Sequence, residues 1–113
     1  MSNNKTIDEY AAWAKTKWFG SDETGFGCER DLTVMGFGLS GETGEVMEIL
    51  KKRVRDNYLD KDHLKKELGD VIYYWANLCN AFGFTPSEVL QSNIDKIEDR
   101  HARGVMSGSG NDR

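Results

Sequence analysis

The stretches Gly41-Glu42-Thr43-Gly44-Glu45 and Glu67-Leu68-Gly69-Asp70 share one pattern: a glutamate, a glycine two residues later and a second carboxylate three residues later. Both stretches lie in segments with helical spacing, and residues three apart lie on the same side of a helix. If the two helices pack as a hairpin, four carboxylates meet in one groove. Like charges so close cannot all stay ionised. A hard divalent cation, Mg²⁺ or Mn²⁺, would resolve this, because both prefer oxygen ligands.

The alternative is that these residues are ordinary solvated glutamates, as most glutamates on helices are. The glycines favour a site. A glycine inside a helix costs roughly 1 kcal/mol relative to alanine, yet Gly44 and Gly69 occupy the same place between the two carboxylates of each pair. Close approach of the two backbones at this level would explain both glycines.

The composition limits the class of protein. The 113 residues fit a single domain over 1–113, with 1–5 and 107–113 expected to be flexible. The net charge of −4 argues against direct nucleic-acid binding. Met1 to Thr6 is polar and no apolar run approaches the roughly 20 residues of a membrane span, so we expect a cytoplasmic protein without a membrane partner. Cys28 and Cys79 form no disulfide framework.

Helical periodicity dominates the chain and strand-like alternation is scarce, which predicts an all-α fold resembling a four-helix bundle. Capping boxes are expected at Thr6 to Glu9 and at Thr85 to Glu88. The expected helices run from Thr6 to about Phe19, from about Leu32 to about Arg55, from Asp60 or Asp62 to about Phe82, and from Pro86 to about Arg103. The predicted inward faces are Tyr10, Trp13, Ala14 and Trp18; Met35, Leu39, Val46, Ile49, Leu50 and Val54; Leu64, Leu68, Val71, Ile72, Trp75, Leu78, Cys79 and Phe82; and Val89, Leu90, Ile94 and Ile97.

Carboxylates on helices can form a di-iron site or a site for Mg²⁺. Di-iron bundles use a Glu-x-x-His motif, and neither His63 nor His101 lies three residues after a glutamate of these pairs. A site made only of oxygen ligands instead suits Mg²⁺ with a phosphate substrate. In that case the helix after Pro86 offers donors for phosphate oxygens, namely Asn93, Lys96 and Arg100.

The chain resembles the MazG-like family of all-α nucleoside triphosphate pyrophosphohydrolases, in its short single-domain phage and bacterial form. The resemblance covers roughly Leu39 to the end of the chain. The matching residues are Gly41-Glu42-Thr43-Gly44-Glu45-Val46, Leu64-Lys65-Lys66-Glu67-Leu68-Gly69-Asp70-Val71, Asn93-Ile94-Asp95-Lys96, Arg100 to Gly104, and the tail Ser107-Gly108-Ser109-Gly110-Asn111-Asp112.

The resemblance implies specific roles. The family pattern is Glu-Glu-x-x-Glu followed after a spacer by Glu-x-x-Asp, and Gly41 stands here in place of the first Glu. The implied ligands of Mg²⁺, with Mn²⁺ able to substitute, are Glu42, Glu45, Glu67 and Asp70. Glu45 is expected to orient the attacking water and, with Glu42, to act in catalysis. Contacts to the phosphates are implied for Asn93, Lys96 and Arg103, alongside Arg100.

The implied reaction is cleavage of an NTP or dNTP to the monophosphate and pyrophosphate, in a homodimer or homotetramer. The favoured substrate is (d)GTP, because large aromatics of the first helix and its loop, such as Trp13, could stack on a bicyclic base. The competing hypothesis is a helical binding protein that kept the fold and lost turnover, with Gly41 as the sign of decay. For a phage protein, the compartment would be the host-cell cytoplasm.

Overall fold

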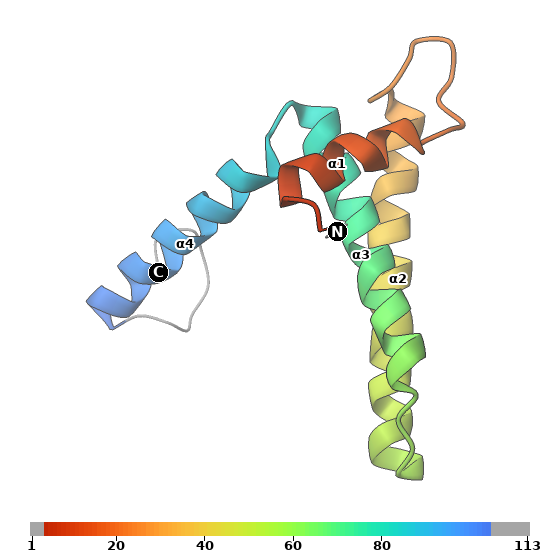
Figure 1. Cartoon of the computed structure of the whole chain (residues 1–113), viewed down its shortest axis with the longest axis vertical. Helices are drawn as coiled ribbons and strands as arrows, with labels where there is room; N and C mark the ends of the chain where they lie inside the picture. Colours follow the sequence, from red (N-terminus) through yellow and green to blue (C-terminus); the bar gives the residue numbers. More distant parts are fainter. Residues whose placement is uncertain (1–3, 105–113) are drawn as a thin grey trace.

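The computed structural model describes residues 4–104, which form four helices and no strand (Figure 1). The helices are α1 (Ile7–Thr16), α2 (Glu29–Asp56), α3 (Lys61–Phe82) and α4 (Pro86–Arg103). The all-α prediction is therefore confirmed. Most of the two ends expected to be flexible, residues 1–3 and 107–113, lies outside the described residues. None of the described helices is long and apolar enough to cross a membrane.

Local sequence signals set where the helices begin and end. The predicted capping boxes are present: Thr6 accepts from the Glu9 amide at 3.0 Å, and Thr85 accepts from the Glu88 amide at 3.3 Å. Each box satisfies amides that have no partner inside the helix. α3 and α4 end at glycines with left-handed backbones. The boundaries differ near the first loop, because α1 stops at Thr16 rather than Phe19 and α2 begins at Glu29.

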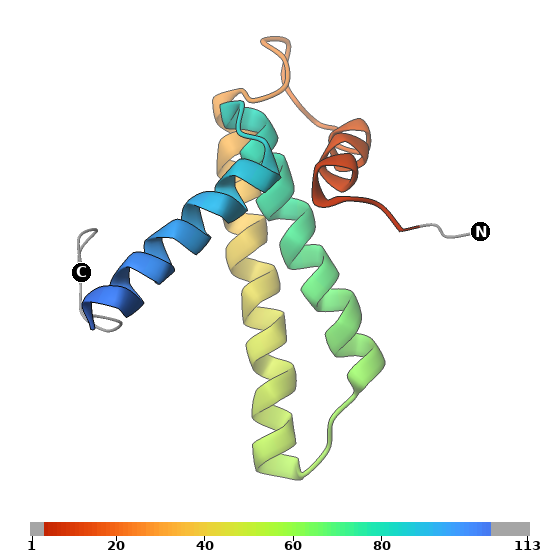
Figure 2. The same ribbon diagram turned by 60° about the vertical axis from the view of Figure 1, so that its left-hand side comes forward.

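α2 and α3 form a long antiparallel hairpin joined by residues 57–60 (Figures 1 and 2). The hairpin is closely packed where the Tyr74 ring of α3 lies against Gly38 of α2. A Cβ atom at position 38 would overlap this ring. The absence of a side chain on α2 therefore allows an aromatic side chain of α3 to enter the space between the helices.

α1 crosses α3 near the end of the hairpin formed by the start of α2 and the end of α3 (Figure 1). Two small residues of α1, Ala11 and Ala14, are fully buried there. Their carbonyl oxygens accept hydrogen bonds from α3, at 3.0 Å from Asn80 Nδ2 and at 3.4 Å from Asn77 Nδ2. Asn77 is itself fully buried, so these bonds satisfy an amide that would otherwise be costly to bury.

α4 leaves the other helices and points away from the hairpin (Figures 1 and 2). Its beginning is held by Asp8, which accepts from the Ser87 amide at 2.8 Å and from the Ser87 hydroxyl at 2.6 Å. Of the apolar side chains of α4 that were predicted to point inward, Val89 is half-buried and the other three are exposed within one chain. Ile94 is 51% exposed, Leu90 44% and Ile97 39%.

The predicted inward faces of the other helices also overstate burial. Trp13, Leu50, Val54, Leu68, Ile72 and Phe82 are exposed. The apolar side chains that are fully or nearly fully buried are few among the described residues: Ala11, Ala14, Met35, Ile49, Ala76 and Cys79. A hairpin with α1 on one side has too little surface to cover both of its faces. Several residues that the sequence correctly assigns to the apolar face of a helix therefore stay exposed among the described residues.

We expect Gly38→Ala to lower the free energy of unfolding by about 1–3 kcal/mol, because the added methyl group meets a rigid ring. Gly36→Ala is the matched control. It lies on the same helix with open space around it, and alanine there should stabilise by up to about 1 kcal/mol. Urea unfolding followed by circular dichroism measures both. Equal stability of the two variants would contradict the close approach at Gly38.

Candidate metal centre in the helical hairpin

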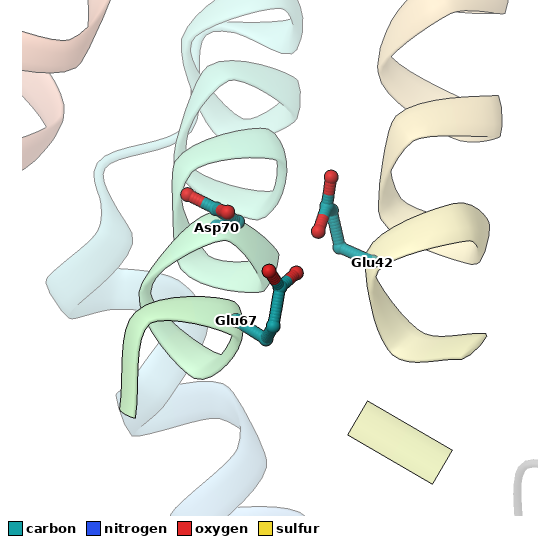
Figure 3. A group of neighbouring side chains, drawn as sticks. All are labelled: Glu42, Glu67 and Asp70. Carbon is teal, nitrogen blue, oxygen red and sulfur yellow. The ribbon is translucent and has the colours of Figure 1, made fainter. Parts of the chain in front are cut away.

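Three of the four predicted carboxylates meet between α2 and α3 (Figure 3). Glu42 extends from α2, whereas Glu67 and Asp70 extend from one side of α3, as their spacing of three residues predicts. An oxygen of each side chain lies within 4.8 Å of an oxygen of each of the others. The hairpin therefore brings together three carboxylates that are distant in the sequence, because Glu67 and Asp70 follow Glu42 by 25 and 28 positions.

The neighbouring carboxylates make it harder for Glu42 to lose its proton. The pKa of Glu42 is raised from 4.5 to about 7. The largest cause is its hydrogen bond with Glu67, followed by burial and by the charges of Glu67, Asp70 and Glu45. Protonation of Glu42 thus relieves the crowding of negative charge among these carboxylates.

The surroundings of Glu67 support the same interpretation. Its side chain is 16% exposed, and its Oε1 lies 3.3 Å from Nε2 of His63, one turn earlier on α3. Its Oε2 is buried and accepts no hydrogen bond within the part of the chain that the structure describes. Buried carboxylate oxygens are normally satisfied, so this oxygen marks a place for a positively charged ligand. The i, i+4 spacing was the signal that could have linked His63 to the site.

Glu45 is not part of the three-residue group. It lies one turn further along α2, exposed to solvent, although its charge still raises the pKa of Glu42. The glycine explanation also needs correction. Open space surrounds Gly44 and Gly69, so neither is required by close packing; the close approach is one turn from Glu42, at Gly38.

The predicted phosphate-binding residues lie on α4, whose C-terminal half is apart from the hairpin (Figures 1 and 2). Asn93 lines a cavity of ≈ 380 Å³ with Leu39, Val71 and Trp75 of the hairpin. Further along α4, Lys96 is exposed, Arg100 is 8% exposed and Arg103 forms an exposed ion pair with Asp99 at 2.8 Å. One chain therefore does not bring the C-terminal half of α4 to its own carboxylates.

Trp13, the predicted stacking residue, lies on α1 with its ring centre 5.6 Å from that of Tyr10. It is 42% exposed and lines none of the cavities described here. The aromatic cavity of this protein lies instead at Trp18, just after α1, and at Tyr73 and Tyr74 of α3. Trp18 and Phe19 belong to the first-helix region from which stacking aromatics were expected, but the sequence did not indicate the walls from α2 and α3, because these segments are far apart in the chain.

The raised pKa of Glu42 predicts a pH dependence of stability in the absence of metal. Between pH 4.5 and about 7 the folded protein keeps a proton that the unfolded chain has lost. The contribution of this group to stability is thus greatest below pH 4.5 and falls as the pH rises to about 7. We expect Glu42→Gln to gain stability over the wild type from about pH 5 to about pH 8, measured by urea unfolding with EDTA. Parallel curves for the two proteins would refute the raised pKa of Glu42.

Comparison with known proteins agrees with the resemblance seen in the sequence. A family model described as "MazG nucleotide pyrophosphohydrolase domain" matches residues 31–105, which include α2, α3 and α4 almost entirely. The chain is 40% identical to "Gene 37 protein" of Mycobacterium phage L5 over 87 residues, covering 73% of this chain and 76% of that protein. No solved structure gives a significant match. Glu42, Glu67 and Asp70 thus lie within the matched region, and the chain belongs to the MazG nucleotide pyrophosphohydrolase domain family.

Proposed function

We propose that this protein is a divalent-metal-dependent pyrophosphohydrolase that cleaves a ribo- or deoxyribonucleoside triphosphate to the monophosphate and pyrophosphate. The observation that carries the proposal is the meeting of Glu42, Glu67 and Asp70 between α2 and α3, in a chain of the MazG family. The proposed substrates include (d)GTP, whose bicyclic base offers the largest surface for stacking on aromatic side chains.

A divalent cation fits the residues present. The donors are carboxylate oxygens, one of them is buried without a hydrogen bond among the described residues, and the pKa of Glu42 is raised by its neighbours. Glu42, Glu67 and Asp70 would hold Mg²⁺, with Mn²⁺ as a substitute and Glu45 as a further ligand from the next turn. When bound, the cation supplies Lewis-acid stabilisation of the charge on the phosphoryl oxygens.

The residues around this group would position the water. In the proposed reaction, a water oxygen bonds to the α-phosphorus and the bond from that phosphorus to the bridging oxygen breaks, so the leaving group is pyrophosphate. Glu45 is exposed one turn from Glu42, where its carboxylate can accept a hydrogen bond from the attacking water and receive its proton. Glu42 assists by helping to orient the reacting groups at the centre of the cluster.

We propose further that the chain acts as a homodimer or a dimer of dimers. The support is the apolar surface left on α4 by Leu90, Ile94 and Ile97, and on the hairpin by Leu68 and Ile72. Monomeric proteins rarely expose large apolar patches. In such an assembly, α4 of one copy covers the hairpin of another. Phosphate contacts from Asn93, Lys96, Arg100 and Arg103 then come from a second copy.

The catalytic proposal predicts which carboxylates matter. Glu42→Gln, Glu67→Gln, Asp70→Asn and Glu45→Gln should each lower kcat/KM for nucleoside triphosphates about a hundredfold or more, because each removes a charge that the cation or the water needs. Pyrophosphate release from a panel of NTPs and dNTPs with Mg²⁺ measures this. Glu48→Gln is the matched control: Glu48 is exposed and pairs with Lys51 at 3.1 Å, so its loss should cost less than about fivefold.

A binding measurement separates failure of the metal site from failure of turnover. Mg²⁺ should raise the melting temperature of the wild type, because a ligand bound only by the folded state stabilises it. This rise should vanish in Glu67→Gln and Asp70→Asn. A protein that binds metal and nucleotide without releasing pyrophosphate from any member of the panel would favour the binding-module alternative.

The assembly proposal predicts that Ile94→Glu lowers the molar mass measured by light scattering, because a charge enters an apolar contact. Its kcat/KM should fall about tenfold, as should that of Lys96→Ala, since a charge-assisted bond to phosphate is worth roughly 1.5–3 kcal/mol. Ser92→Glu is the control, because Ser92 is exposed and about 200° around α4 from Ile94. A monomeric wild type with full activity would rule the assembly out.

A further inference from the structure

An aromatic cavity of ≈ 240 Å³ lies between the loop after α1 and the upper part of the hairpin. Its walls include Trp18 and Phe19 from the loop, Tyr73 and Tyr74 from α3, and Arg30 and Val34 from α2. The Trp18 and Tyr73 rings are stacked with centres 6.1 Å apart. Sites that hold a whole drug-sized ligand are roughly 300–1,000 Å³. This cavity therefore suits one flat ring system with the rest of the ligand outside.

The cavity and the carboxylate group lie at different levels of the same hairpin. Arg30, Val34, Gly38 and Glu42 follow one another at intervals of four along α2, and residues at this spacing form a continuous ridge. At 1.5 Å per residue, Val34 lies about 12 Å along the axis from Glu42. On α3, Tyr74 follows Asp70 by four residues and fills the space beside Gly38. A nucleotide with its phosphates at the carboxylates would have to span about 12 Å along the hairpin to place its base in the cavity.

Arg30 gives the cavity its polarity. Its side chain is exposed and forms no hydrogen bond or ion pair with any of residues 4–104. A guanidinium offers donors only, in a planar fork. Guanine presents two adjacent acceptors, O6 and N7, that match this fork. Adenine and cytosine place an amino donor in the corresponding position, and uracil and thymine offer a single acceptor.

We propose that this cavity binds the base of the substrate and that Arg30 selects guanine by donating to O6 and N7. This inference rests on the proposed function for its phosphates, but it concerns residues outside the carboxylate group. The aromatic walls would stack on the base, and stacking of this kind does not discriminate between the bases. Arg30 would supply the discrimination.

The test is equilibrium binding of four nucleoside monophosphates, GMP, AMP, CMP and UMP, to the whole chain with Mg²⁺ by titration calorimetry. The wild type should bind GMP at least about tenfold more tightly than the other three. Arg30→Met keeps the length of the side chain and removes the donors. It should lower the affinity for GMP about tenfold and leave the affinity for AMP within about threefold.

Arg53→Met is the matched control, because Arg53 is an exposed arginine at the far end of the same helix, and it should preserve the GMP preference. Tyr73→Leu should weaken binding of all four nucleotides together. Absence of a GMP preference in the wild type, or an equal loss for all four nucleotides in Arg30→Met, would overturn the proposal. Hydrolysis of triphosphates without guanine preference overturns the base assignment alone, whereas GMP preference without hydrolysis supports it and counts against the catalytic proposal.

Discussion

The close approach of α2 and α3 at Gly38 and Tyr74 sets the geometry on which the rest of this protein depends. The Tyr74 ring can enter the space between the helices only because position 38 has no side chain. One turn along each helix from this contact are Glu42 and Asp70. The packing that seats an aromatic ring therefore also holds the carboxylates together, and the hydrogen bond with Glu67, burial and the nearby negative charges raise the pKa of Glu42 to about 7.

A second buried carboxylate behaves in the opposite way. Asp31 is almost fully buried at the start of α2. Burial opposes its charge, but hydrogen bonds from the Ser21 hydroxyl and the Gly27 amide outweigh it and lower the pKa of Asp31. The Ser21 hydroxyl lies 2.5 Å away and the Gly27 amide 3.0 Å away. Asp31 thus holds residues of the loop that leads from α1 to α2. Among residues 4–104, the carboxylates in the hairpin have the His63 ring beside Glu67, but the buried Oε2 of Glu67 has no hydrogen-bond donor.

The direction of α4 explains why so much apolar surface stays exposed. Asp8 fixes the first turn of α4 through Ser87, and from there the helix moves away from the hairpin. The apolar stripe of α4 has helical spacing, but Ile94 and Ile97 stay exposed among the residues that the structure describes. A helix with this pattern normally gains most of its stability by packing that stripe against a neighbour. The proposed assembly would supply the missing neighbour and would bring basic residues of α4 towards the carboxylates.

The helices, the caps that begin α1 and α4, and the shared side of α3 on which Glu67 and Asp70 lie could all be predicted from the amino-acid pattern. These features depend on residues within one or two turns of one another, where spacing fixes geometry. Three features became visible only in the folded chain. Gly38 is the glycine at the close approach of the helices, Glu45 lies outside the three-residue group, and Arg30 lines an aromatic cavity. Those properties depend on contacts between segments far apart in the chain. A local sequence pattern does not indicate the distances between such segments or the burial of their side chains. The amino-acid pattern indicated the candidate carboxylates, and the packing of α2 against α3 determines which of them lie close together.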